Sequence, residues 1–517
     1  MIEYSEKTII FAGRSGLVDF ELDAFANLQL DVTLANAAEI EIVIGEVLTP
    51  AGCINRDPGG YRIVRTMRKN LPAGSSAFDF DMPPHKSAYE WNPVIPLPDE
   101  AGGPVAPFRY VEITGAAPGD KAVLKRRELH GPCKDEDSNF KSSCSQLDRI
   151  WEFCKYTMKA TSGFGCFIDG ERERLPYEGD SYVNQFGFFC CSTDRNVPRN
   201  TVDWLLERPT WPTEWHLVMV LYVRDYILYT GDRSCLEKWR PLLEKSLLPE
   251  NVTPDGLLLA HTRREGSTDI VDWPPEERDG YEHGEVNLVP SCYYYSALKA
   301  MTELYGDSKY EKMAERVKAS IYRLMFDEKS GLFVDSPGSK HTALHSAFFP
   351  LYFDVADDPE PLKKVILSHG MDCSVYCAHF LVEACFRYGM TDHAMKLLTS
   401  RGLRSWQNMI DKGATMAMEA WDDSLKPNQD WNHAWGAAPA GLIPRMIGGI
   451  TPSAPGFVQF NFDPHPGDLE YFTLKHPTPF GAITVDYRNG WFELDIPEGT
   501  CGIYRGEKLG AGKHLLK

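Results

Sequence analysis

Two widely separated stretches of this sequence concentrate side chains that can transfer protons. The first, Asp169–Asp180, contains five carboxylates and two arginines between apolar neighbours. Burying that much charge is costly, which favours a functional role over a purely structural one. Carboxylates transfer protons and bind hydroxyl groups, and the ring of Tyr177 offers an apolar face, so the stretch suits a sugar site. The alternative interpretation of this stretch alone is a solvated charged loop.

The second stretch, Gly413–Asp422, is followed closely by Asn432–Ala437. Its Glu419 lies among small and apolar residues, next to Met418 and close to Trp421. A lone carboxylate in such an apolar run is not expected to lie at the protein surface. One carboxylate from each stretch, meeting across a pocket, would form the acid and base pair of a glycosidase.

Both stretches resemble motifs of one enzyme family. Glu173-Arg-Leu-Pro-Tyr-Glu-Gly-Asp180 is similar to the Glu-Arg-Leu-Gly-Trp-Thr-Gly-Asp signature of bacterial α-L-rhamnosidases, glycoside hydrolase family 78. The stretch from Ser405-Trp406 to Trp421-Asp422, with Asn432-His433, resembles a second block of that family. Val271-Asp272-Trp273 resembles a further element on the substrate side. The resemblance runs through most of residues 140–517.

The sequence also departs from the family pattern. The family begins its first block with Asp-Cys-Pro, five or six residues before the catalytic glutamate, whereas Asp169 stands four residues before Glu173 and no Cys-Pro is present. Pro176 replaces a glycine, and Tyr177 and Met418 each replace a tryptophan. These changes leave the proton chemistry in place and alter the pocket wall, so the exact sugar stays open.

The resemblance implies a role for each glutamate. Glu173 would be the general acid and Glu419 the general base that activates water, which is an inverting mechanism. An inverting pair lies about 6.5–9.5 Å apart, against roughly 5–5.5 Å for a retaining pair. The acid has to stay protonated near neutral pH, so burial or a neighbouring negative charge has to raise its pKa.

Arg172 and Arg174 adjoin this acid and would oppose its protonation. In an extended segment, neighbouring side chains point to opposite sides. We therefore expect both arginines to pair with the other carboxylates of the first stretch. Asp180 and Asp169 would then lie close enough to bind sugar hydroxyls and to keep the proton on Glu173.

Further residues are assigned to substrate binding. A 6-deoxy sugar carries a methyl group that favours aromatic neighbours, although any single tryptophan is more often a core residue. Trp273 is the strongest aromatic candidate because it follows Asp272 in a loop rich in acidic residues and proline. A histidine in an apolar run is usually structural, and the resemblance is what favours His433. The complete predicted substrate-binding set is Asp169, Arg172, Tyr177, Asp180, Trp215, Asp272, Trp273, Trp421 and His433.

The composition limits the possible partners. A net charge of −19 argues against nucleic acid and anionic membranes as partners. The N-terminal residues lack a basic segment followed by an apolar one, and no apolar run approaches the roughly 20 residues that span a bilayer. The 13 cysteines lie mostly in helical or apolar contexts, which predicts reduced thiols and a cytoplasmic protein. No His/Cys spacing resembles a zinc site, and we predict no metal or cofactor.

Residues 1–135 are predicted to form an antiparallel β-sandwich. The segments Val18–Asp23, Leu28–Leu34, Ile40–Ile44 and Phe108–Thr114 alternate, or nearly alternate, apolar and polar residues. Turns rich in proline and glycine separate them. The acidic residues from Asp135 onward are expected to be the linker out of this domain.

Residues 136–447 are predicted to be helical. In the first helix, at 145–158, the apolar residues fall on one face. Gly231, Gly306 and Gly389 follow helix ends as left-handed caps, at a spacing that fits successive helical hairpins. The family resemblance implies six hairpins in an (α/α)6 barrel, whereas periodicity alone leaves an open solenoid equally acceptable.

Residues 448–517 return to an alternating pattern, with a hairpin turn at Asn489-Gly490. We predict a small antiparallel β-sandwich that caps the barrel. The predicted protein is therefore mainly α-helical, with a β-sandwich domain on either side of an (α/α)6 catalytic barrel.

The favoured function is that of a cytoplasmic α-L-rhamnosidase acting on terminal rhamnosyl residues of short oligosaccharides or plant-type glycosides. A glycosidase for a different sugar is one alternative, because the pocket wall departs from the family pattern. A non-catalytic carbohydrate-binding protein is another, and a polysaccharide lyase on the same type of barrel is a third. Homodimers are common among soluble proteins, so a homodimer is compatible with the sequence.

Overall fold

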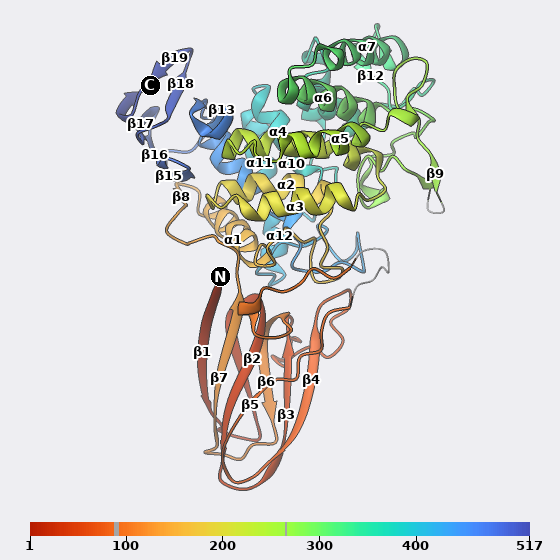
Figure 1. Ribbon diagram of the computed structural model, residues 1–517. Helices are drawn as coiled ribbons and strands as arrows, with labels where there is room; N and C mark the ends of the chain where they lie inside the picture. The colour runs from red at the N-terminus through yellow and green to blue at the C-terminus, as the bar shows by residue number, and fades with distance from the viewer. Residues whose placement is uncertain (87–92, 264–265) are drawn as a thin grey trace.

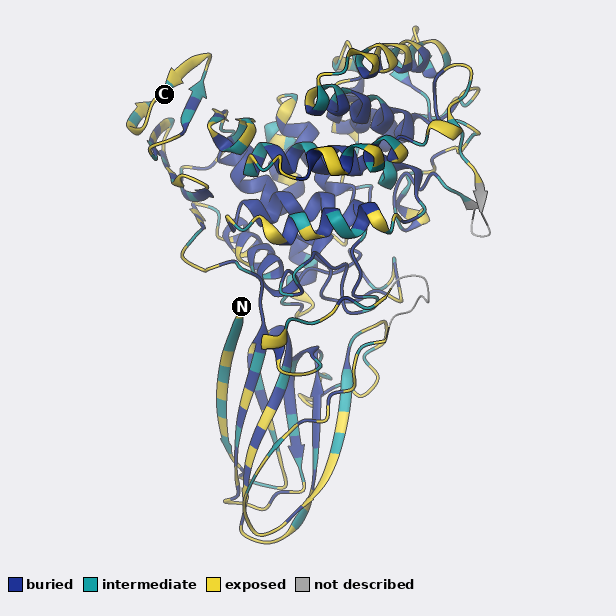
Figure 2. Cartoon of the chain, viewed as in Figure 1, coloured by how far each residue is buried: buried dark blue, intermediate teal, exposed yellow. Residues whose placement is uncertain are grey.

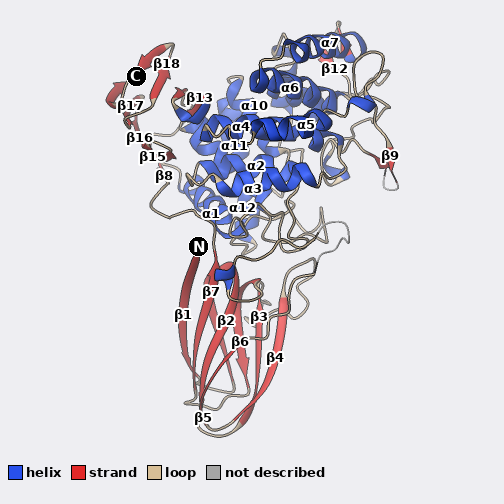
Figure 3. Cartoon of the chain, in the orientation of Figure 1, coloured by secondary structure: helices blue, strands red, loops and turns tan. Residues whose placement is uncertain are grey.

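The computed structural model describes residues 1–86, 93–263 and 266–517. A strand-rich N-terminal domain lies at one end of a helical domain, and a smaller strand-rich domain lies against its flank (Figures 1 and 3). The helical domain is therefore accompanied by a β-sheet domain on the side of each chain end. Among the described residues, no helix is both long and apolar enough to cross a membrane.

In the described part of the N-terminal domain, seven strands form one sheet. Its order is β1 (Ile2–Ile10), β7 (Lys121–Leu129), β2 (Ser15–Leu34), β6 (Ala106–Thr114), β3 (Ala38–Gly45) and β4 (Val64–Leu71), with β5 (Gly74–Asp79) also on β2. All of these pairings are antiparallel, as predicted. β2 is long enough to pair with β6, β7 and β5, so it joins these strands by hydrogen bonds into one sheet.

A bulge in β2 docks this sheet onto the helical domain. The two strands predicted at 18–23 and 28–34 are one strand, whose register with β6 shifts between Asp19 and Ala24. The Tyr156 hydroxyl donates to the carbonyl of Asp23 (2.5 Å), and the Asp23 N–H donates to Thr415 Oγ1 (2.8 Å). The bulge thus turns backbone groups of the sheet toward the helices.

Two buried carboxyls, Asp23 and Glu46, interact beside this contact. Burial raises the pKa of Asp23 to about 6. Burial and the negative charge of Asp23 raise the pKa of Glu46 well above its ordinary value. Asn432 of the helical domain donates to Glu46 Oε1 (3.1 Å), so the pair belongs to the domain interface.

Replacing Asp23 by asparagine is expected to raise the melting temperature by about 3–6 °C at pH 8 and to change it little at pH 4. The folded-state pKa is raised, so the stability from the protonated group is fully present below its unfolded pKa of about 3.9. That stability is lost as the pH rises through about 6, and asparagine cannot ionise. Thermal unfolding at both pH values tests this, with the exposed Asp81→Asn as control. Equal destabilisation of Asp23→Asn at both pH values would contradict it.

A closed ring of helices forms the centre of the helical domain. Around the ring, α2 (Glu178–Phe189), α4 (Thr213–Thr230), α6 (Leu288–Tyr305), α8 (Leu344–Tyr352), α10 (Ala378–Arg387) and α13 (Pro439–Leu442) each pack on the next, and α13 packs on α2. The other helices are α1 (Ser145–Thr161), α3 (Asn196–Glu207), α5 (Leu236–Ser246), α7 (Ser308–Met325), α9 (Glu360–Ser368), α11 (Thr391–Leu398) and α12 (Trp406–Asp411). The domain is therefore barrel-like and not an open solenoid.

The distribution of apolar residues in each helix matches how deeply that helix is buried. In α2 and α8 every residue is buried, whereas α7 buries Tyr310, Ala314, Val317 and Ile321 at helical spacing and exposes much of the opposite face (Figure 2). Gly231, Gly306 and Gly389 have positive φ angles of 69°, 68° and 74°, as the predicted left-handed caps require.

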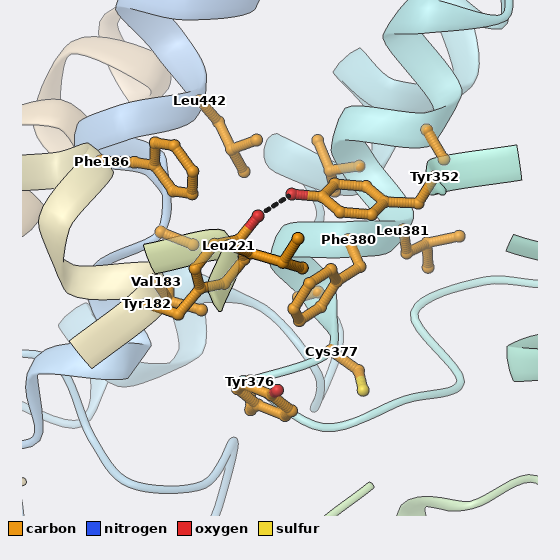
Figure 4. Close-up of a cluster of buried hydrophobic side chains, with 14 of the residues drawn as sticks. Tyr182, Val183, Phe186, Leu221, Tyr352, Tyr376, Cys377, Phe380, Leu381 and Leu442 are labelled. Carbon is orange, nitrogen blue, oxygen red and sulfur yellow. Dashed lines mark hydrogen bonds between the residues drawn. The ribbon is translucent and has the colours of Figure 1, made fainter. Parts of the chain in front are cut away.

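Aromatic side chains fill the interior of the ring (Figure 4). The hydroxyls of Tyr182 and Tyr352 lie 3.1 Å apart in a hydrogen bond. The ring of Tyr376 lies 5.4 Å from that of Trp435 and 6.5 Å from that of Trp215. Through these contacts the aromatic core continues directly into the wall of a cavity at one end of the ring.

Two sheets form the C-terminal β domain. One contains β13 (Ile450–Ala454), β14 (Gln459–Phe462), β18 (Cys501–Tyr504) and β19 (Glu507–Leu509). The other contains β20 (Gly512–Leu516), β17 (Trp491–Ile496), β16 (Gly481–Arg488), β15 (Tyr471–Thr478) and β8 (Asn139–Ser142). Phe462 and Phe492 connect them, with ring centroids 5.6 Å apart.

Two features of this domain differ from the prediction, and one agrees. The pairing of β14 with β18 is parallel, not antiparallel. The segment that follows the first domain is not only a linker, because its strand β8 joins the second sheet and Phe140 stacks on Phe472. The hairpin turn at Asn489-Gly490 is present, with φ angles of 47° and 88°.

Candidate active site

Residues 169–177 of the first acidic stretch form a tight loop between α1 and α2, and the last three residues of the stretch begin α2. Asp169 closes the loop, because its N–H donates to the carbonyl of Leu175 (2.8 Å) and its Oδ1 accepts the Leu175 N–H (3.0 Å). Arg174 has a φ angle of +51°, which reverses the chain. We predicted an extended segment, in which neighbouring side chains alternate between two sides. The segment is instead a turn, so its side chains do not alternate in this way.

The second stretch runs beside the residues that follow it. The Glu419 N–H donates to the carbonyl of Asp430 (3.2 Å), and the His433 N–H donates to that of Ala417 (2.8 Å). Thr157 of α1 fixes the start of this segment by accepting the Ala417 N–H (2.9 Å). Glu419 is consequently held on a rigid backbone, and the residue is 2% exposed.

Backbone contacts connect the two stretches. The Glu171 N–H donates to Asn432 Oδ1 (2.7 Å), and the Arg172 N–H donates to Asp430 Oδ2 (3.2 Å). Gly170 lies so close to Asp430 that a Cβ atom there would overlap the carboxylate. These contacts place the Arg172–Glu173 pair opposite Glu419.

Arg172 lies against both predicted catalytic glutamates. Its Nη1 donates to Glu419 Oε2 (2.6 Å), and its Nε lies 3.4 Å from Glu173 Oε1. We expected Arg172 to pair with another carboxylate of its own stretch, and this prediction was wrong because the loop turns its side chain toward the second stretch. Arg174 does pair within its stretch, with Glu171 (2.6 Å). Tyr177 donates a hydrogen bond to Glu173.

His433 lies between two carboxylates. Its Nε2 is 2.9 Å from Asp180 Oδ1, and its Nδ1 is 3.0 Å from Asp430 Oδ1. Burial opposes charge on the ring, but Asp430 and Asp180 outweigh it and raise the pKa of His433 well above its ordinary value. The group is therefore an imidazolium at neutral pH, and it holds both carboxylates in place.

The buried carboxyls of the site differ in their electrostatics. Burial, together with the charge of Glu173, raises the pKa of Asp169 well above its ordinary value. Burial also raises the pKa of Glu419, although His433 and Arg172 counteract it. Lys426 Nζ lies 3.5 Å from Glu419 Oε1 and adds a second cation beside this carboxylate.

A cavity of about 170 Å³ is lined by carboxylates of both stretches and by four tryptophans. Its lining includes nearly all predicted site residues, namely Asp169, Arg172, Glu173, Tyr177, Asp180, Trp215, Trp273, Glu419 and His433. It also includes Trp211, Pro212, Ile270 and Trp435. Asp169 Oδ2 and Trp215 Nε1 are buried and have no hydrogen-bond partner among the described residues.

A strained loop carries Ile270 and Trp273 to the cavity. Glu214, at the start of α4, accepts the N–H groups of Ile270 (3.2 Å) and Val271 (2.7 Å). Val271 has a φ angle of +60°, which β-branched residues rarely adopt. Asp272 accepts the Ser374 N–H (2.9 Å) and lies 2.8 Å from His345 Nε2, so the loop is fixed from both sides.

Two predicted substrate-binding residues are outside the cavity lining. Asp272 is fully buried in its contacts with Ser374 and His345, which position the backbone of Trp273. Trp421 is fully buried against Trp406, and its Nε1 donates to the carbonyl of Cys373 (2.8 Å). Both side chains support the site from behind and do not face it.

Asp430, Lys426 and Trp211 also belong to the site but were not predicted from the sequence. Asp430 stands three residues before His433, a spacing at which a carboxylate can reach an imidazole, and that signal was available. Trp211 precedes Trp215 by four residues at the entrance to α4. Lys426 carried no local signal, because its contact with Glu419 depends on how the intervening loop folds.

The sequence matches two family models. One is described as a bacterial alpha-L-rhamnosidase 6 hairpin glycosidase domain and matches residues 135–447. The other is described as a bacterial alpha-L-rhamnosidase C-terminal domain and matches residues 449–502. None of the curated proteins matches the chain by sequence.

Solved structures share the fold. The family 78 rhamnosidase of Bacillus sp. GL1 is 17% identical with a TM-score of 0.74, and the match covers 97% of this chain and 54% of that one. The alpha-L-rhamnosidase from Dictyoglumus thermophilum is 17% identical with a TM-score of 0.75, and the match covers 98% of this chain and 63% of that one. The Streptomyces avermitilis alpha-L-rhamnosidase, solved with L-rhamnose, is 16% identical with a TM-score of 0.75, and the match covers 100% of this chain and 54% of that one.

The chain spans between half and two thirds of the length of these three relatives. At such identities the likeness concerns the fold alone. The first family model, however, covers more than half of this sequence. The chain therefore belongs to the bacterial α-L-rhamnosidase family.

Proposed function

We propose that this protein is an α-L-rhamnosidase that hydrolyses terminal α-L-rhamnosyl residues of short oligosaccharides or glycosides. One observation carries the proposal. Glu173 and Glu419 come from remote parts of the chain, yet both contact the guanidinium of Arg172 at the wall of one cavity. In a chain of this family, that arrangement supplies an acid and a base to one substrate.

The cavity suits a single neutral sugar. Ligand pockets for drug-sized molecules are about 300–1,000 Å³, so a cavity of about 170 Å³ fits one ring better than an oligosaccharide. The tryptophan walls offer apolar contact to the methyl group and C–H faces of a 6-deoxy sugar. Asp169 Oδ2 and Trp215 Nε1, which have no partner among the described residues, are available for hydrogen bonds to sugar hydroxyls.

In the proposed reaction, Glu173 gives its proton to the glycosidic oxygen, and the bond from that oxygen to the anomeric carbon breaks. Glu419 takes a proton from water, whose oxygen bonds to the anomeric carbon from the opposite face. Arg172 and Lys426 favour the ionised form of Glu419 that a base requires. Arg172 stands between the two glutamates, and we therefore favour the wider, inverting separation over the retaining one.

We also propose that the protein is cytoplasmic. Among the described residues all cysteines are free thiols, which is compatible with the reducing cytoplasm. A small-molecule glycoside is the proposed partner, and a homodimer stays compatible with the sequence.

The anomeric form of the first product tests the proposal. With p-nitrophenyl α-L-rhamnoside, we expect proton NMR to detect β-L-rhamnose before mutarotation produces the α form. Initial release of α-L-rhamnose would contradict the inverting mechanism. Hydrolysis of another sugar's aryl glycoside, without hydrolysis of the rhamnoside, would favour the rival glycosidase. Binding of rhamnose by a folded protein that hydrolyses none of the glycosides would favour a non-catalytic role.

A further inference from the structure

A loop of the N-terminal domain reaches the mouth of the cavity. It precedes β4, and its Tyr61 N–H donates to the carbonyl of Gln429 in the helical domain (3.1 Å). The next residue, Arg62, pairs with Asp423 (2.7 Å) and lies over the ring of Trp431 at 4.6 Å. Both contacts are to the segment that leads from Glu419 to His433.

The position of this loop is closely defined. Gly60 has a φ angle of +57°, and a Cβ atom there would lie 2.5 Å from the Gln429 carbonyl oxygen. Only a glycine permits this approach without a shift of the backbone. The Arg62 side chain is 6% exposed and also donates from Nε to the carbonyl of Pro58 (2.9 Å). Tyr61 is therefore held between two anchored neighbours.

Tyr61 itself is left open to solvent. The residue is 47% exposed, although its neighbour Arg62 has a side chain that is only 6% exposed. Its ring centroid lies 5.7 Å from the guanidinium carbon of Arg172, and Tyr61 is not part of the cavity lining. The exposed ring therefore stands outside the cavity, beside the arginine that contacts Glu173.

The proposed reaction places the leaving group on the side of the cavity where Glu173 lies. The acid delivers its proton to the leaving oxygen, so the leaving group lies next to Glu173. Since the cavity holds about one sugar, the rest of the substrate has to lie at the rim. His85, also from the N-terminal domain, lies 3.2 Å from the Glu173 carbonyl oxygen, so this domain borders Glu173 at His85 and the adjoining Arg172 at Tyr61.

We propose that Tyr61 is a specificity-determining residue whose ring stacks on a flat, apolar face of the leaving group. The inference rests on the proposed function, because it takes Glu173 as the acid. The ligand chemistry is a ring next to the scissile bond, either an aromatic ring or the C–H face of a second sugar. A substrate with an alkyl leaving group would gain nothing from this residue.

The test compares the kcat/KM values of three rhamnosides: methyl, p-nitrophenyl and a rhamnosyl-glucose disaccharide. In Tyr61→Ala we expect kcat/KM for at least one ring-bearing substrate to fall about tenfold relative to methyl rhamnoside. Intrinsic leaving-group reactivity cancels, because each substrate is compared between variant and wild type. A fall for the p-nitrophenyl substrate alone identifies an aromatic leaving group, and a fall for the disaccharide alone identifies a sugar.

Two further variants separate stacking from a supporting role. Tyr61→Phe keeps the ring and should keep the wild-type ratios, while Tyr4→Ala removes an exposed tyrosine of the same domain and serves as control. An equal loss on all three substrates in Tyr61→Ala would overturn the inference, because it would show that Tyr61 only supports Arg172. A wild-type protein that hydrolyses no rhamnoside would overturn the proposed function and this inference together.

Discussion

Glu419→Gln is expected to lower kcat for every rhamnoside by about 10³–10⁴-fold, because the amide cannot take a proton from the attacking water. The substitution is nearly isosteric, and the amide oxygen can still accept from Arg172. The loss should be similar for methyl and p-nitrophenyl rhamnosides, since attack by water and departure of either leaving group share one transition state. Initial rates of rhamnose release measure it.

A small anionic nucleophile offers a second readout for Glu419. Azide needs no general base, so it should partly restore turnover of p-nitrophenyl rhamnoside in Glu419→Gln and yield an inverted rhamnosyl azide. Glu276→Gln is the matched control, because Glu276 is exposed on the loop after Trp273. Near wild-type turnover of Glu419→Gln without azide would show that another group acts as the base.

Glu173→Gln is expected to produce a loss that depends on the leaving group. Methoxide leaves only when protonated, so kcat/KM for methyl rhamnoside should fall by about 10³-fold or more. Nitrophenolate is a far better leaving group, and its rhamnoside should lose only about tenfold. Rate measurements on the two substrates, side by side, give the ratio directly.

The pH dependence offers an independent check on Glu173. A general acid limits activity at high pH, because it must be protonated to act. The alkaline limb of the pH profile of kcat/KM should therefore disappear in Glu173→Gln on p-nitrophenyl rhamnoside, while the acidic limb set by the base stays. Equal losses on both substrates, with both limbs retained, would remove Glu173 from the role of acid.

Much of the local structure was predictable because it depends on neighbours in the sequence. The apolar face of the first helix is buried at Leu147, Ile150 and Trp151, as its periodicity indicated. The left-handed glycines ended their helices, and Asn489-Gly490 formed its hairpin. These features follow from backbone sterics and from periods of two or 3.6 residues, which a single sequence displays.

The site was predictable in part. Charge density and the motif resemblance identified the two stretches, and the structure brings Glu173, Glu419 and His433 to one cavity. The pairing of the charges was not predictable. Arg172 contacts Glu419 because the first stretch is a turn, and His433 bridges to Asp180 because the two stretches lie side by side.

The sequence by itself determined the types of chemical group in this protein, the order of its strand-rich and helical regions, and the caps and turns inside them. Only the tertiary structure decided that Asp272 and Trp421 support the site from behind, that Asp430 and Lys426 enter it, and that Tyr61 of another domain stands at its rim. The physical reason is that periodicity reports which face of an element is buried. Which remote residues meet across that face depends on how the elements pack, and packing is a property of the whole chain.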